Sequence, residues 1–87
     1  MAEIERARYT ASTDAIYVYL PVSHGEYFRT TDFGDGVMLD YDRDRVIFGV
    51  EFMNASRGVS LEGIPNAQFV AEAIREVCPA ALGGRSR

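Results

Sequence analysis

The sequence predicts a small α+β domain, in which an antiparallel β meander of four to five strands is followed by one C-terminal amphipathic helix. Apolar residues recur with period two through the first half of the chain and with helical period in the second half. The chain has 87 residues, of which 47% are hydrophobic and 25% charged, as in globular proteins. This length suits one domain, which we place at residues 1–82, with 83–87 as a flexible C-terminal tail.

Five segments have the composition of β-strands. Residues 15–20 are the strongest candidate, because β-branched, aromatic and aliphatic side chains fill them. Small, polar and glycine-containing segments separate the strands and favour turns. The expected strands are residues 7–9, 15–20, 26–31, 37–42 and 46–53, the last two forming the clearest hairpin.

Parity predicts which side chains of this hairpin share a face. Side chains alternate between the two faces of a strand, so a loop with an even number of residues aligns the two apolar sets. One face would then carry Val37, Leu39, Tyr41, Val46, Phe48, Val50 and Phe52. Ile47 and Met53 would point the other way.

The period changes after residue 63. Five apolar residues recur at helical spacing and predict a helix that packs on the sheet: Phe69, Val70, Ala73, Ile74 and Val77. Asn66 is a candidate N-cap, and Pro79 is expected to end the helix.

Several short motifs follow one another in a specific order. They are Tyr9, Asp14-Ala15-Ile16-Tyr17-Val18, Asp35-Gly36-Val37-Met38-Leu39-Asp40-Tyr41-Asp42, Gly49-Val50-Glu51-Phe52, Asn54-Ala55-Ser56 and the segment 58–65. Their order resembles that in the small bacterial proteins of domain-of-unknown-function family 2283 (DUF2283). The resemblance implies the fold predicted above and supplies no catalytic residues. Similar sequences often have Asp-Gly in the last hairpin turn, where this chain has Asp44-Arg45. That glycine would suit a bulged three-residue loop, which is the alternative to the even loop.

Charge and cysteine content exclude several classes of function. The net charge is −4, and no run of basic residues is present, so neither nucleic acid nor a membrane surface is an expected partner. Cys78 is the single cysteine and cannot form an internal disulfide. The N-terminal residues lack the apolar segment of a signal peptide, and no apolar run reaches transmembrane length. We therefore expect a cytoplasmic protein.

A cluster of acid, amide and hydroxyl side chains at the ends of strands is the candidate ligand site. Its residues are Asp14, Asp40, Glu51, Asn54 and Ser56. The alternative interpretation is structural, with Asp14 and Asn54 bonding backbone groups in turns and Glu51 facing solvent or an arginine.

Other constellations fail on their context. Asp40, Asp42, Asp44 and Glu51 have the spacing of a calcium-binding loop, but Arg45 stands where that loop needs glycine, and the flanks are strands. Ser60 and the single histidine, His24, could join a catalytic triad only if the fold brought them together. We therefore predict no bound metal, no cofactor and no enzymatic activity.

The second face of the sheet is expected to carry the function. It would expose an aromatic and thioether patch, which monomers seldom leave open. The residues of this patch are Tyr17, Tyr19, Met38, Ile47 and Met53. The sequence thus favours a non-enzymatic interaction module that acts as a homodimer. The alternatives are a small-ligand or metal-binding protein and an antitoxin-like regulatory partner of a small basic protein.

Overall fold

The computed structural model describes residues 5–83 of the chain, which contain five strands, one 3-10 helix and two α-helices. The strands are β1 (Ala7–Thr10), β2 (Ala15–Tyr19), β3 (Tyr27–Gly34), β4 (Val37–Asp42) and β5 (Ile47–Phe52). The 3-10 helix η1 (Ala55–Arg57) and the helices α1 (Ala67–Val77) and α2 (Ala80–Gly83) follow. The predicted fold class is confirmed: an open antiparallel sheet precedes an amphipathic C-terminal helix.

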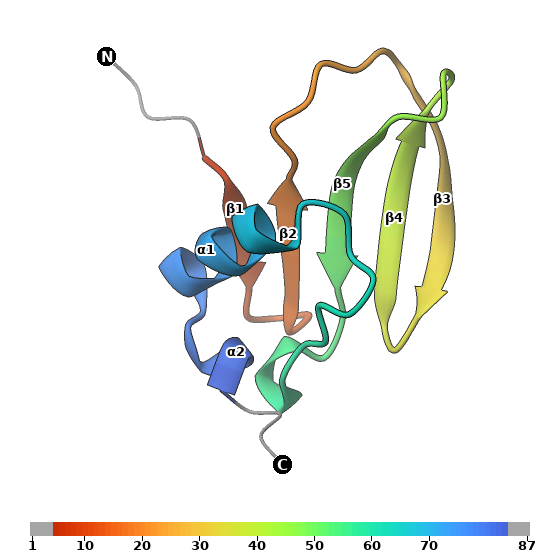
Figure 1. The fold of residues 1–87 in the computed structure, drawn as a ribbon. Helices are drawn as coiled ribbons and strands as arrows, with labels where there is room; N and C mark the ends of the chain where they lie inside the picture. The colour runs from red at the N-terminus through yellow and green to blue at the C-terminus, as the bar shows by residue number, and fades with distance from the viewer. Residues whose placement is uncertain (1–4, 84–87) are drawn as a thin grey trace.

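The strand order is β1-β2-β5-β4-β3, with every neighbouring pair antiparallel. Only β3, β4 and β5 form a meander, and β5 inserts between β2 and β4. The connection from β2 to β3 therefore passes the ends of two strands (Figure 1). Residues 20–26 span this gap of three strand spacings, about 14 Å, because seven residues reach about 23 Å when extended.

Helix α1 covers one side of the sheet over β1 and β2 (Figure 1). Val70, Ala73 and Ile74 are fully buried against it, and Phe69 and Val77 are partly buried at the border. The five apolar positions predicted for the helix thus all meet the core. Asn66 stands at the N-cap in a left-handed conformation, but its side chain makes no capping hydrogen bond.

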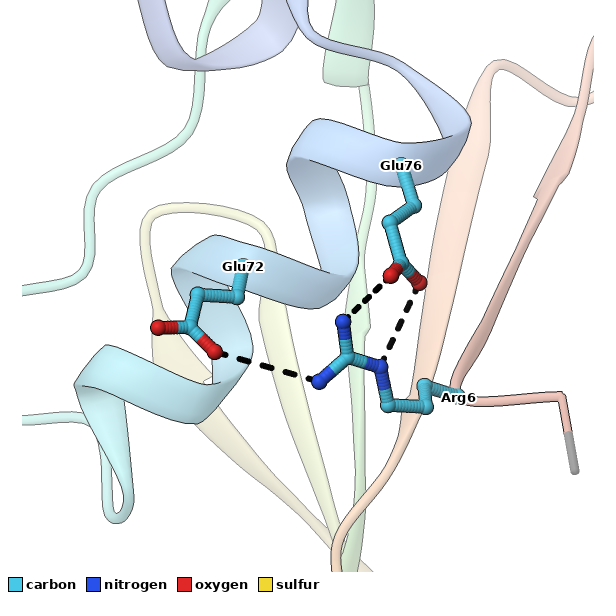
Figure 2. A network of polar contacts seen from close by, with 3 residues as sticks. All are labelled: Arg6, Glu72 and Glu76. Atoms are coloured by element: carbon cyan, nitrogen blue, oxygen red, sulfur yellow. Dashed lines mark hydrogen bonds and ion pairs between the residues drawn. The ribbon is translucent and has the colours of Figure 1, made fainter.

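An arginine before β1 fastens α1 to the edge of the sheet (Figure 2). Arg6 donates from Nε to Glu76 at 3.3 Å and pairs a second time with the same carboxylate, while its Nη1 lies 3.8 Å from Glu72. The guanidinium also lies 5.3 Å from the centroid of the Phe69 ring. The hydrogen bond from Arg6 lowers the pKa of the Glu76 carboxyl.

The β4–β5 hairpin departs from the parity prediction. The backbone N–H of Asp42 donates to the carbonyl oxygen of Val46, and the Asp42 carboxylate accepts from the backbone N–H of Val46. These bonds close a loop of three residues, 43–45, whose third residue, Arg45, is left-handed with φ 69°. A register shift follows, because Asp40 pairs with Gly49 while Tyr41 pairs with Ile47.

This shift makes Phe48 the extra residue of a β-bulge and reverses the alternation of side chains before it. Ile47 packs against the core, so its predicted place on the opposite face is wrong. Phe48 leaves the core and stacks on His24 with ring centroids 4.0 Å apart.

The C-terminal region contains a helix that the sequence did not predict. Pro79 does end α1, but the next residues form the single turn of α2, in which Ala81 is buried. Of the predicted tail, Gly83 belongs to α2 and residues 84–87 lie outside the described residues. Within residues 5–83, neither helix has the length and apolar character needed to span a membrane.

Candidate functional site

The five predicted ligand residues do not form one site. Asp14 and Ser56 meet where the β1–β2 turn touches η1, and Asn54 directly precedes η1. Asp40 and Glu51 lie on the central strands, on the side of the sheet away from α1. The sequence analysis grouped these five residues as one cluster at strand ends, whereas the structure divides them between two places and puts Asp40 inside β4.

Asp14 connects two turns. Its carboxylate accepts hydrogen bonds from the Ser56 backbone N–H at 2.9 Å, the Ser56 hydroxyl at 2.7 Å and the Tyr9 hydroxyl at 3.0 Å. The bonds from Ser56 lower the pKa of the Asp14 carboxyl, and the bond to Asp14 raises the pKa of the Tyr9 phenol. These partners occupy the carboxylate, which favours a structural role for Asp14 and Ser56.

Asn54 takes part through its backbone. It has φ 55°, a left-handed conformation that asparagine tolerates better than most residues, and its side chain makes no capping hydrogen bond to η1. Its side chain is exposed beside the Asp14–Ser56 contact. Asn54 therefore lies apart from Asp40 and Glu51 and shares no polar site with them.

The side of the sheet away from α1, which we call the open face, carries a mixture of aromatic, thioether and charged side chains. Its residues are Arg8, Tyr17, Tyr19, Thr30, Asp32, Met38, Asp40, Glu51 and Met53. Tyr19 and Met53 are 41% and 38% exposed. Four of the five residues predicted for the dimer patch therefore share this face, and Ile47 does not.

A glycine allows the Tyr17 ring to lie across the open face. Gly49 is the residue of β5 between Tyr19 on β2 and Asp40 on β4. A Cβ atom on Gly49 would stand 1.7 Å from the Tyr17 hydroxyl, so the ring occupies the space that a side chain would need. The hydroxyl reaches over β5 and donates to Asp40 Oδ2 at 2.7 Å.

This contact extends into a polar chain across four strands. Thr30 donates to the second oxygen of Asp40 at 2.6 Å, and the Tyr27 and Thr30 hydroxyls lie 2.9 Å apart. Burial raises the pKa of the Tyr17 phenol far above its ordinary value, and the hydrogen bond to Asp40 raises it further. At neutral pH Tyr17 is therefore a protonated phenol that donates to the Asp40 carboxylate.

Asp42 is the buried acid that the sequence did not single out as structural. It is 2% exposed, and its carboxylate accepts from the backbone N–H groups of Gly25, Asp44 and Val46 at 2.8–2.9 Å. These hydrogen bonds lower the pKa of the Asp42 carboxyl, and the bond from the Gly25 N–H has the largest effect. An aspartate directly before a three-residue turn is the signal that could have identified it.

The calcium-like spacing does not produce a convergent set of oxygens. Asp40 turns to Tyr17 and Thr30, whereas Asp42 turns to backbone groups of the turn and of the β2–β3 loop. In the described part of the chain, no three His, Cys, Asp or Glu side chains are grouped so that they could hold a metal ion.

The two residues considered for catalysis, His24 and Ser60, make separate local contacts. His24 stacks on Phe48, and its Nδ1 lies 2.7 Å from the carbonyl oxygen of Gly25. Ser60 accepts a long hydrogen bond, 3.5 Å, from the backbone of Glu62. Within residues 5–83 no hydrogen bond joins His24 to Ser60.

A comparison with protein families gives one match. The model described as "Protein of unknown function (DUF2283)" matches residues 6–56, which include all five strands and exceed half of the chain. No match was found among curated proteins or among solved structures.

Proposed function

We infer that this chain, which belongs to the DUF2283 family of proteins of unknown function, is a non-enzymatic interaction module that acts as a homodimer. The observation that carries the proposal is the open face, where Tyr19 and Met53 stay exposed and Tyr17 and Met38 are half-buried. Tyrosine and methionine are enriched at protein interfaces. We also propose a cytoplasmic setting, which the single cysteine, Cys78, fits because it forms no internal disulfide, and a bacterial origin, which rests on the resemblance of the sequence alone.

The charges of the open face suit a second copy of the same chain. One row of paired residues crosses all five strands, from Arg8 on the β1 edge through Tyr17, Glu51 and Met38 to Asp32 on the β3 edge. A two-fold axis parallel to the strands places β1 of one copy over β3 of the other. Arg8 then faces Asp32 at both ends of the row, as an isologous interface requires.

The polar groups of the open face support a binding role over a catalytic one. Both oxygens of Asp40 accept hydrogen bonds, from Tyr17 and from Thr30. A general base must reach a proton of the substrate, whereas each oxygen of Asp40 is directed at a neighbouring side chain of the sheet. We therefore favour association over catalysis.

Two other roles lead to different measurements. A small-ligand protein using Asp40 and Glu51 would be stabilised against heat by that ligand. An antitoxin-like regulator would bind a small basic partner with strong salt dependence. Neither has a feature as extensive as the open face to support it.

Light scattering coupled to size-exclusion chromatography tests the homodimer. We expect the wild type at 100 μM or so to have the mass of two chains, because apolar patches of this kind are buried in stable complexes. Tyr19→Arg should shift the mass to one chain, with unchanged circular dichroism. Gln68→Arg on the exposed side of α1 makes the same charge change away from the open face and should leave the dimer intact.

A second variant tests the orientation of the two copies. Glu51 lies in the middle of the charged row, so the two-fold axis brings it near the Glu51 of the other copy. Removing this repulsion in Glu51→Gln should tighten the dimer, whereas Tyr19→Arg weakens it. A monomeric wild type at this concentration, or a dimer that survives Tyr19→Arg, would refute the proposal.

A further inference from the structure

A cavity of about 430 Å³ lies at the outer end of the sheet, away from the helix-covered strands. Its volume falls in the range of small-molecule sites, about 300–1,000 Å³. The walls come from β3, β4 and the β4–β5 turn, and they contain three arginines: Arg29, Arg43 and Arg45. Three cations around one cavity stand out in a chain whose net charge is −4.

The local fold explains why these arginines gather. Arg29 pairs with Tyr41 and so points to the core side of the sheet, at an edge strand that α1 does not cover (Figure 1). The register shift next to Arg29 leaves Phe28 as an extra residue. The centroid of the Phe28 ring lies 5.9 Å from the Cζ atom of Arg29 and 5.1 Å from that of Arg43. Cation–π contacts with one phenyl ring therefore position two guanidinium groups beside the cavity.

Two of the three positive charges have no acidic partner among residues 5–83. Arg43 pairs with Glu26 at 3.6 Å, whereas Arg29 and Arg45 form no ion pair within this part of the chain. Asp42 lines the cavity too, but its carboxylate accepts three backbone N–H groups. The walls therefore keep guanidinium donors available to a ligand.

We propose that this cavity binds a phosphate monoester whose organic part is a flat ring. Guanidinium groups bind phosphate oxygens in pairs of parallel hydrogen bonds, and they stack on aromatic planes. A phosphate monoester carries a charge of about −1.5 to −2 at pH 7, which matches the two arginines without acidic partners. Phe28 and Tyr41 supply aromatic walls for the ring.

The cavity is independent of the proposed dimer. Arg29 and its partner Tyr41 lie on the core side of the sheet, while Tyr19 and Met53 lie on the open face. Ligand binding should therefore persist in the monomeric Tyr19→Arg variant. A failure of either proposal leaves the other standing.

Isothermal titration calorimetry at constant ionic strength tests the site with phenyl phosphate, inorganic phosphate and benzoate. We expect phenyl phosphate to bind most tightly, since benzoate has one charge and inorganic phosphate lacks the ring. Arg29→Gln should weaken phenyl phosphate binding about tenfold or more, as expected for the loss of charged hydrogen bonds. Arg75→Gln on α1 makes the same change in net charge outside the cavity and should alter affinity less than twofold.

Two further variants move affinity in opposite directions. Glu26→Gln frees Arg43 from its ion pair and should tighten binding. Arg45→Gly removes a wall arginine and also suits the left-handed backbone at that position, φ 69°. It should lower affinity while leaving the melting temperature unchanged or raised, which excludes unfolding as the cause.

Three results would overturn the proposal. The first is the lack of saturable phenyl phosphate binding at millimolar concentration. The second is an equal loss of affinity in Arg29→Gln and Arg75→Gln, since that would indicate a response to net charge only. The third is benzoate binding as tightly as phenyl phosphate.

Discussion

The two sides of the sheet are built by the same strands but are stabilised differently. On the core side, Ile16, Val18, Val50 and Phe52 are at most 1% exposed and pack under α1 and the C-terminal loops. On the open face, side chains lie along the sheet and bond to one another, as the hydroxyl of Tyr17 does with Asp40. Apolar burial supports the fold on one side, whereas contacts between polar and aromatic side chains organise the other.

The largest difference between the sides should appear when adjacent residues are truncated. Phe52 and Met53 point in opposite directions and are 1% and 38% exposed. Phe52→Ala should lower the free energy of unfolding by about 3–5 kcal/mol, because it opens a cavity in the core. Met53→Ala should change the free energy of unfolding of the monomer by less than about 1 kcal/mol, because Met53 lies at the surface of the single chain. Urea unfolding followed by circular dichroism measures both.

Similar losses in the two variants would contradict the assignment of the faces. Urea unfolding of the wild type at several protein concentrations separates folding from association, since a dimer makes stability concentration-dependent.

A smaller effect is expected from the contact between Gly49 and Tyr17. Gly49→Ala should destabilise the protein by about 1–3 kcal/mol, the usual cost of overpacking, because the new methyl group collides with the Tyr17 hydroxyl. In a Tyr17→Ala background the same change should cost about 1 kcal/mol less, since the colliding atoms are gone. A double-mutant cycle measured by urea unfolding gives this coupling. Strictly additive losses would show that the ring does not occupy this space.

The smallest effect is confined to acid pH. The folded-state pKa of Asp42 lies below its unfolded value, so its contribution to stability is complete above about pH 4 and is lost as the pH falls through the folded pKa. Asp42→Asn has no titrating group at this position. When the pH is lowered from 7 to below 4, its melting temperature should therefore fall by less than that of the wild type. Asp14 and Glu76 act in the same direction, so part of the acid dependence should remain. Melting temperatures between pH 2 and 7 give the comparison.

Local pattern predicted four of the strands to within one residue at each end and the buried side of α1, whereas β3 continues to Gly34, three residues beyond its predicted end. The order of the strands was not predictable, because the apolar periods of β2 and β5 do not state which strands pair. The hairpin parity failed at Phe48, where one extra residue reversed the side of Ile47. A bulge of this kind depends on the turn, and here Arg45 takes a left-handed conformation that glycine usually supplies.

The candidate site was harder to predict than the fold. The structural interpretation expected Asp14 and Asn54 to bond backbone groups in turns: Asp14 does so through the Ser56 N–H, whereas the Asn54 side chain makes no capping hydrogen bond. The cavity with Arg29 and Arg45 was not predicted, because its members come from an edge strand and a turn and share no motif. Their proximity follows from the pairing of β3 with β4 and from the three-residue loop, both of which are properties of the assembled sheet.

The glycine beneath the Tyr17 ring also limits how related sequences can vary. Position 49 and position 17 share one volume, although they lie on different strands. A relative with any side chain at position 49 must replace the tyrosine or turn it away from β4, and then Asp40 loses its partner across the sheet. Tyrosine, glycine and aspartate at positions 17, 49 and 40 should therefore be inherited together or exchanged together.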